Sequence, residues 1–161
     1  MAEAVIVADD IVWETLKRNC LITPLQLRGI MFMLELKYRK EKYDGLNTRE
    51  PFVKYPYGPT VEDVRKLYEI FGGENIRYIP DYRYLTEEKD QYVVKSYAFS
   101  HYDLQKEQRD FIANNLEQYL KIAQWDLVRL TQEDPEWKDR SDGDWYNLRK
   151  SLEYYDKKGV I

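Results

Sequence analysis

The segment Phe52-Val-Lys-Tyr-Pro-Tyr-Gly-Pro-Thr60 places two prolines, a glycine and two tyrosines between two stretches with helical patterning. Pro56 and Pro59 hold φ near about −65° and disfavour the helical conformation in the residues before them. The backbone should therefore be extended and then turn at Gly58. Such a rigid, aromatic turn either covers the core or presents its tyrosines to a partner.

A helix is expected directly after this turn. Thr60 and Asp63 have the spacing of a capping box, and apolar residues follow at helical intervals over Val61–Phe71. The pair Gly72-Gly73 then supplies a left-handed stop. Before the turn, Glu50–Tyr55 is β-prone and predicts a short strand.

Two helices are predicted upstream of that strand. Asp9 or Asp10 can cap the first. Thr23-Pro24 is a typical helix start, and apolar residues on one face extend the second helix to about Glu41. Gly29 lies inside the second helix, where glycine costs about 1 kcal/mol relative to alanine, so another part of the backbone should approach closely there.

Downstream of the turn, the pattern predicts a small sheet and a long helix. Ile76–Ile79 and Tyr92–Tyr97 are β-prone and are expected to form antiparallel strands joined by a polar, mobile link, Asp81–Asp90. Asp103–Ala123 carries a strong apolar stripe, which makes it the candidate central core helix.

The C-terminal third predicts two more helices. Trp125–Leu130 continues the helical pattern, Thr131–Trp137 interrupts it with a proline, and a last helix is expected over about Asp144–Lys157. The predicted fold class is therefore mainly α (α+β): a compact helical domain of about five to six helices with a small two- or three-stranded antiparallel sheet. We expect residues 1–161 to form a single domain.

Composition limits the classes of function. The chain has 161 residues, 43% hydrophobic and 34% charged, with a net charge of −4 whose acidic excess lies in the C-terminal half. Nucleic-acid binders generally need a basic face to neutralise phosphates, so this class is unlikely on charge grounds. The basic run Lys37–Lys42 is the local exception, and it is interpreted as the solvated end of a helix.

Cysteine and histidine each occur once. Cys20 cannot form an internal disulfide, fits a reducing cytoplasm and is expected to be a small core residue. His101 is expected at the start of a helix, because a lone histidine cannot build a zinc site without several carboxylates. No apolar run approaches the length of about 20 residues that a bilayer needs, so we expect a soluble cytoplasmic protein without a membrane partner.

The residues form no convincing catalytic or metal site. Neither Ser96 nor Ser100 lies in a nucleophile-elbow context, and the order of elements around Gly72-Gly73 is the reverse of a phosphate loop. The acidic residues of segment 133–144 do not have the spacing of a calcium loop and are expected to be solvated. The prediction is a binding module that is not an enzyme, with no catalytic residues, no metal and no cofactor.

Four parts of the chain resemble the Panacea domain family, which includes SocA-like antitoxins and GepA-like phage-associated proteins. Leu27-Arg-Gly-Ile-Met-Phe32 is similar to the family's leading helix, and a Tyr-Gly-Pro turn followed by a helical tyrosine resembles Tyr57-Gly58-Pro59 and Tyr68. Asp103–Ala123 and Trp125–Leu130 resemble the family's long and short helices. The family's Thr-His-x-x-x-Pro-Trp element resembles Thr131-Gln132-Glu133-Asp134-Pro135-Glu136-Trp137. The resemblance covers roughly residues 24–137.

Two positions depart from the family pattern. Gln132 replaces the usual histidine, and Gly29 replaces the usual lysine. A role that needs the imidazole would be lost, although glutamine still donates and accepts hydrogen bonds. The family-motif residues, structural or binding, are Tyr57, Gly58, Pro59, Tyr68, Thr131, Gln132, Pro135 and Trp137.

The resemblance implies an antitoxin of a bacterial or prophage toxin–antitoxin system. Such a protein would bind a toxin, encoded by an adjacent gene, and could act as a protease adaptor that delivers the toxin for degradation. The alternatives are a phage or bacterial regulatory protein that binds nucleic acid through Lys37–Lys42, and a hydrolase that uses His101 with the acidic segment. The turn is expected to orient the helix from Val61 against that from Thr23, near Pro135–Trp137. Partner choice is then expected at Asp81–Asp90 and in the acidic C-terminal third.

Overall fold

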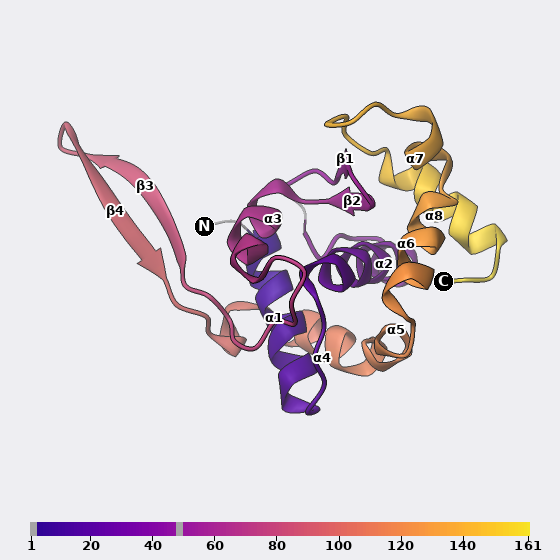
Figure 1. Cartoon of the computed structure of the whole chain (residues 1–161), viewed down its shortest axis with the longest axis horizontal. Coiled ribbons are helices and arrows are strands. Elements are labelled where there is room, and N and C mark those ends of the chain that lie inside the picture. Colours follow the sequence, from indigo (N-terminus) through magenta and orange to yellow (C-terminus); the bar gives the residue numbers. More distant parts are fainter. Residues whose placement is uncertain (1–2, 48–49) are drawn as a thin grey trace.

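The structure is a computed structural model that describes residues 3–47 and 50–161. It is mainly α with two small antiparallel sheets, as predicted (Figure 1). The elements in chain order are α1 (Glu3–Lys17), α2 (Pro24–Lys42), β1 (Val53–Tyr55), β2 (Gly58–Thr60), α3 (Glu62–Tyr68) with the 3₁₀ turn η1 (Glu69–Phe71), β3 (Tyr82–Glu88), β4 (Gln91–Tyr97), the 3₁₀ turn η2 (His101–Asp103), α4 (Lys106–Asn115), α5 (Glu117–Leu120), α6 (Gln124–Gln132), α7 (Pro135–Asp139) and α8 (Leu148–Lys157).

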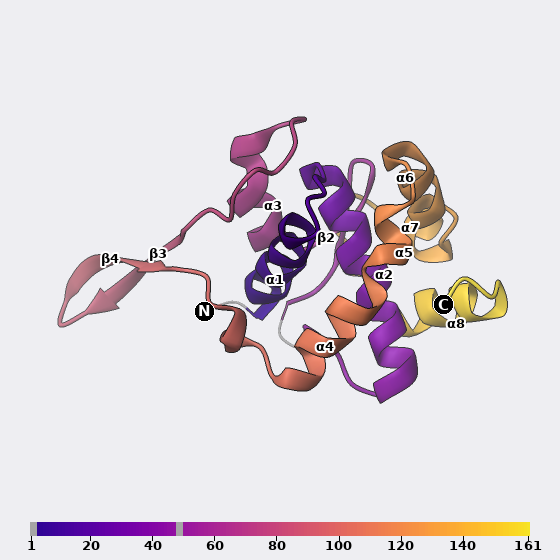
Figure 2. The same ribbon diagram turned by 90° about the horizontal axis from the view of Figure 1, so that it is seen from below.

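The central element is α2. Its start is the predicted one, because Thr23 and Gln26 form a reciprocal capping box and Pro24 occupies the first turn. Residues 29 to 36 are all buried, so α2 has no solvent face over this stretch. It contacts α1, α3, α4, α6, α8 and β2, and Figure 2 shows α1 on one side of it and α6 and α8 on the other.

The predicted central helix, Asp103–Ala123, is instead an outer layer divided into η2, α4 and α5. Its buried side chains, such as Phe111, Ile112 and Tyr119, form one stripe, and the remaining faces are largely open to solvent. A helix with a single apolar stripe covers a core from outside. A helix that is buried on all sides, as α2 is over residues 29–36, lies within the core.

The first helix starts earlier than its predicted caps. Asp9 and Asp10 lie inside α1 and are 1% and 0% exposed, because the apolar run Ala4–Ala8 extends the helix before them. Cys20 was expected in the core but is exposed. Asn19 takes a φ of 55°, a left-handed conformation that ends the helix and places Cys20 in the connection to α2.

The predicted strand before the turn is confirmed as β1, but it pairs with a second strand that the sequence did not reveal. In this hairpin Val53 pairs with Thr60, which keeps Thr60 extended. The N-cap of α3 therefore falls on Val61, which offers no side-chain hydrogen bond, and the predicted Thr60 cap is wrong. The backbone of Asp144–Tyr146 runs beside β1 and bonds to Phe52 and Lys54.

The second sheet differs most from the prediction. Asp81–Asp90 is not a link, because β3 occupies most of it and pairs along its whole length with β4, while Ile76–Ile79 forms no strand. Lys89 and Asp90 make the two-residue turn with φ of 49° and 63°. Two turn residues with positive φ are usually asparagine and glycine. Because Lys89-Asp90 lacks this pattern, the sequence did not predict the turn. Residues 82–97, named the hairpin arm here, project away from the helical body (Figures 1 and 2).

The last helix, α8, begins at Leu148 rather than near Asp144, because Asn147 caps it by accepting from the amide of Arg149. Gly29 does mark a close approach, but the group facing it is a side chain: a Cβ there would lie 2.8 Å from Leu127 Cγ on α6. The glycine therefore lets α2 and α6 pack together.

Gly29→Ala should destabilise the fold. We expect the overpacking against Leu127, about 1–3 kcal/mol, to exceed the gain of about 1 kcal/mol in helix propensity. In a Leu127→Ala background the same substitution should be neutral or stabilising, since the obstructing side chain is gone. Urea unfolding of the wild type, the two single variants and the double variant measures the coupling between Gly29 and Leu127. An equal effect of Gly29→Ala in both backgrounds would contradict the proposed clash.

Candidate functional site

The Tyr-Gly-Pro turn joins β1 to β2. Tyr55 pairs with Gly58, so Pro56 and Tyr57 are the two turn residues, one position earlier than predicted. Tyr57 has a φ of 73°, which after a proline is the pattern of a type II turn. That position normally takes glycine or asparagine, so the turn holds a tyrosine in a strained conformation.

Beyond the turn, Gly58 and Pro59 are buried against α6. A Cβ on Gly58 would lie 3.0 Å from Thr131 Oγ1, and Gly58 has a φ of 148°. Thr131 is buried, and its hydroxyl donates to the carbonyl of Val128 at 2.8 Å. The glycine thus allows β2 to lie directly on α6.

Lys54 connects the same hairpin to α7. Its ammonium donates to the carbonyls of Trp137 at 2.6 Å and Arg140 at 2.9 Å, and lies 4.4 Å from the centroid of the Trp137 ring. A cation at the C-terminal carbonyls of a helix is favourable. The expectation that the turn region packs near Pro135–Trp137 therefore corresponds to this lysine contact.

The segment around Pro135 is an anchor for the C-terminus, and its acidic residues are not all solvated as predicted. Asp134 is fully buried and caps α7 by accepting from the amide of Glu136, and burial raises the pKa of Asp134. Glu136 is 2% exposed, pairs with Arg140 at 3.0 Å and accepts from the amide of Asn147 at 2.5 Å. These carboxylates hold α7 and the start of α8 together.

Tyr68 lies in a separate part of the core. Its hydroxyl donates to Asp9 Oδ1 at 2.5 Å, and both side chains are 1% exposed. Burial raises the pKa of Asp9 to about 7, against the opposing effect of the Tyr68 hydrogen bond. This pair ties α3 to α1.

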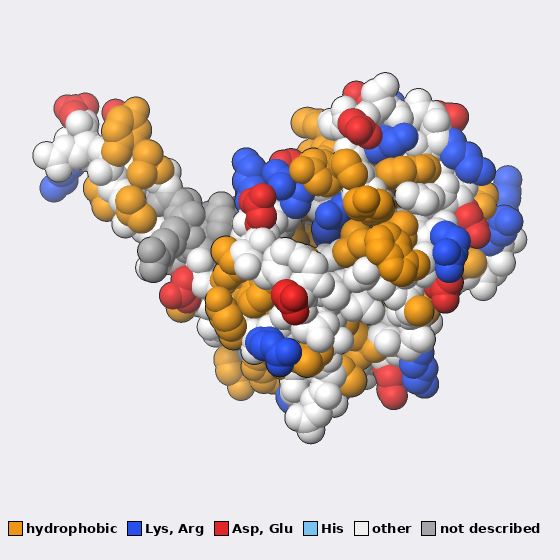
Figure 3. Space-filling view, in the orientation of Figure 1, with side chains coloured by type: hydrophobic (Ala, Val, Ile, Leu, Met, Phe, Trp, Pro, Cys, Tyr) orange, Lys and Arg blue, Asp and Glu red, His pale blue; other side chains and the backbone are white. Residues whose placement is uncertain are grey.

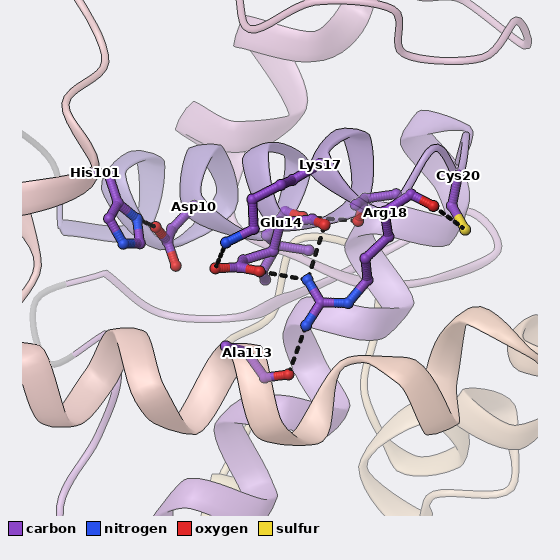
Figure 4. Close-up of polar contacts among 9 residues, drawn as sticks. Asp10, Glu14, Lys17, Arg18, Cys20, His101 and Ala113 are labelled. Atoms are coloured by element: carbon purple, nitrogen blue, oxygen red, sulfur yellow. Dashed lines mark hydrogen bonds and ion pairs between the residues drawn. The ribbon is translucent and has the colours of Figure 1, made fainter.

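The next aspartate of α1 holds η2 in place. Asp10 Oδ1 lies 2.7 Å from His101 Nδ1 (Figure 4). The His101 ring also stacks on Trp13 at a centroid distance of 4.2 Å. Burial raises the pKa of Asp10, and His101 opposes that rise. The predicted position of His101 at a helical start is confirmed, and its carboxylate partner is Asp10.

Figure 4 also shows how the rest of α1 is held. Glu14, 2% exposed, is paired with Lys17 and Arg18, and Arg18 Nη2 donates to the carbonyl of Ala113 on α4 at 2.8 Å. Cys20 lies at the opposite end of this row from His101. The structure does not bring these two residues together as a nucleophile and base.

One motif residue is presented to solvent. Tyr57 is 56% exposed and meets the half-exposed Trp125 edge to face at a centroid distance of 5.8 Å. Figure 3 shows hydrophobic side chains gathered on the surface over β2 and the neighbouring end of α6. The core-covering interpretation of the turn therefore applies to Gly58 and Pro59, which are buried. The alternative, a residue presented to a partner, applies only to Tyr57, which faces solvent.

The eight family-motif residues do not form one site. Gly58 meets Thr131 directly and Pro59 lines the same small pocket, while Gln132 ends α6 and is half-buried. Lys54, which reaches Trp137, and Asp9, which pairs with Tyr68, were missed by sequence reasoning. Nothing in their spacing relates them to partners so distant in the chain.

The basic run Lys37–Lys42 is largely engaged in ion pairs. Arg39 pairs with Glu35 at 2.8 Å, Lys40 with Asp156 at 2.9 Å and Lys42 with Glu107 at 3.3 Å. These contacts join the end of α2 to α4 and α8, in place of a free basic face.

Within residues 3–47 and 50–161, no three His, Cys, Asp or Glu side chains are grouped so that they could hold a metal ion. In the same ranges, every helix is too short or too polar to cross a bilayer.

Gly58→Ala should lower the free energy of unfolding by about 1–3 kcal/mol, because the new Cβ meets Thr131 and the backbone is left-handed. Tyr57→Ala, at an exposed position, should cost about 1 kcal/mol or less. Gly73→Ala is the matched control, since a Cβ there meets nothing within 4 Å. Urea unfolding measures the loss of stability in each variant. A loss in Tyr57→Ala as large as that in Gly58→Ala would refute the expected ranking.

The Asp9–Tyr68 pair should make stability depend on pH. Because the pKa of Asp9 rises from 3.8 to about 7 on folding, the folded state keeps a proton that the unfolded chain releases. The resulting stabilisation, up to about 4 kcal/mol, is present below the unfolded pKa and is lost as pH rises to about 7.

Asp9→Asn should therefore flatten the fall in stability across this range and raise Tm at neutral pH. The substitution keeps an acceptor for Tyr68 without the buried charge. Asp139→Asn, at an exposed position, is the control. Thermal unfolding across the pH range measures the effect, and an unchanged pH slope in Asp9→Asn would exclude this account.

Comparison with known proteins identifies the family. Residues 30–138 match the family described as antitoxin SocA-like, Panacea domain, close to the range of 24–137 expected from the sequence. No curated protein and no solved structure matches the chain. The match begins within α2, ends within α7 and includes the eight family-motif residues. The chain belongs to the SocA-like antitoxin family, and most of it is the Panacea domain of that family.

Proposed function

We propose that this protein is the antitoxin of a bacterial or prophage toxin–antitoxin system and neutralises a toxin by direct protein–protein binding, without enzymatic activity. Membership of the SocA-like antitoxin family supports an antitoxin-like role and a protein partner. The structural observation that carries the proposal is the hairpin arm, which offers a surface suited to such a partner.

One face of the hairpin arm carries three exposed apolar side chains. Leu85 pairs with Val94, and Tyr92 lies two residues away from Val94 on the same face. The exposed fractions of these side chains are 63%, 65% and 75%, respectively. An isolated two-stranded hairpin is marginal in water, and its unpaired strand edges can accept another strand. A bound partner would cover this face and stabilise the arm.

The tip of the arm indicates the charge of that partner. At the end of the hairpin, Glu87, Glu88 and Asp90 outnumber Lys89, and Glu88 forms an ion pair with Lys95 of β4, so the tip has a small net negative charge. A partner with a basic rim around an apolar groove would be complementary to it. The tip lies in the segment where partner choice was expected.

The nucleic-acid alternative receives no support from the basic run. Three cations of Lys37–Lys42 already pair with carboxylates, and the tip has a small net negative charge. Phosphate binding would have to displace these ion pairs. We therefore retain the protein-binding proposal alone.

Co-expression with the product of the adjacent reading frame tests the function. The neighbour should inhibit growth alone and be harmless together with this protein, and the two should co-purify. Toxin abundance separates two mechanisms: occlusion leaves it unchanged, whereas delivery to a protease lowers it. A wild-type protein that neither binds nor neutralises its neighbour would reject the proposal.

The arm is tested with Leu85→Ser/Val94→Ser. We expect binding at least about tenfold weaker, because two apolar contacts are lost at the interface, with little change in the Tm of the helical body. Ile70→Ser is the control, since Ile70 is similarly exposed at 64% but lies on η1. Neutralisation by the double variant at the wild-type level would exclude the arm while leaving the antitoxin function intact.

A further inference from the structure

A small cavity opens between α2, β1 and α3, apart from the hairpin arm. Its volume is about 180 Å³, and its walls include Leu27, Val64 and Tyr68. Two arginines, Arg28 and Arg65, also line it. Small-molecule sites usually occupy about 300–1,000 Å³, so this cavity is suited to one side chain or chain end.

The two guanidinium groups lie against the same aromatic ring. Arg28 Cζ is 5.4 Å and Arg65 Cζ is 4.6 Å from the centroid of Tyr55. Arg65 is also held by Glu62, through Nε at 3.3 Å and Nη2 at 3.1 Å. Its charge therefore has a carboxylate partner within the fold.

Arg28 is different, because it has a rigid position but no anion. Its Nη2 donates to the carbonyl of Pro56 at 2.8 Å, and its Nε is buried without a hydrogen-bond partner. Among the described residues, no carboxylate forms an ion pair with it. Partial burial without an ion pair is unfavourable for a guanidinium, and burial lowers the pKa of Arg28, against a smaller raising effect of Glu62.

We propose that this cavity binds the C-terminal carboxylate of a peptide whose last side chain is apolar. The carboxylate accepts from the Arg28 guanidinium, whose planar set of N–H donors matches a carboxylate. The apolar side chain packs against Leu27, Val64 and Tyr68. The Tyr55 ring supports the guanidinium from the side.

The surroundings favour a single negative charge over a phosphate. Glu62 already neutralises Arg65, and Glu69 lies at the rim 4.0 Å from Arg65 Nη1. A doubly charged group would be repelled by these carboxylates, and it would leave the apolar wall uncovered. This inference goes beyond the proposed antitoxin function, because it needs neither the hairpin arm nor a toxin.

Calorimetry with synthetic peptides tests the proposal on the full chain. The probes are a pentapeptide ending in leucine with a free carboxylate, the same peptide amidated, and an amidated peptide with an internal glutamate. We expect saturable binding of the free acid and at least about tenfold weaker binding of both amidated peptides, because the charge-assisted hydrogen bonds are lost. Equal binding of the amide, tighter binding of the internal glutamate or of inorganic phosphate, or no binding of the free acid would each overturn it.

Arg28→Gln should weaken binding of the free acid at least about tenfold. Arg28→Lys should restore only part of the lost affinity, because lysine lacks the planar, paired N–H donors of the guanidinium group. Arg129→Gln is the control, since that exposed arginine lies on α6 and pairs with Asp126. If Arg28→Gln does not fold, the wild-type protein remains informative by NMR. The Arg28 Nε–H resonance must shift on addition of the free acid and not of the amide, and no shift would reject the site.

Discussion

The fold depends on the complete burial of two packed helices, α1 over residues 4–12 and α2 over residues 29–36. Over residues 29–36, α2 has no exposed face, so the chain has to supply a cover in every direction. α1, itself buried over residues 4–12, and the buried strand β2 cover part of α2, and the amphipathic helices α4, α6 and α8 cover the rest. Two glycines permit the tightest contacts with α6: Gly29 admits Leu127, and Gly58 admits Thr131.

Buried carboxylates then fix the covering elements relative to one another. Asp9 meets Tyr68 of α3, Asp10 meets His101 of η2, and Glu35 accepts from the amides of Leu46 and Asn47 after α2. Glu136 joins α7 to the start of α8. Each of these groups is nearly inaccessible to water, so each would be costly without its partner. The acidic character of the chain is therefore partly structural.

The family motif has both an internal and an external part. Gly58 packs against Thr131, Pro59 lines the same small pocket, and Lys54 ties the same hairpin to Trp137. Tyr57 is held in a left-handed turn and faces solvent beside Trp125. A rigid turn of this kind stabilises the scaffold, whereas the surfaces proposed for binding are the hairpin arm and the Arg28 cavity.

Features of neighbouring residues in the sequence were sufficient to predict the parts of the structure that depend on short-range interactions. The mainly helical class, the start of α2 at Thr23-Pro24, the strand before the turn and the family followed from caps, periodicity and motif order. Contacts between distant segments could not be predicted this way. The pairing of Val53 with Thr60 displaced the α3 cap, the Lys89–Asp90 turn formed a hairpin without the usual residues, and the central helix proved to be α2. The partners of Arg28, Lys54 and Asp9 likewise depend on which faces meet in three dimensions, because burial and charge pairing are properties of the packed chain and not of sequence spacing.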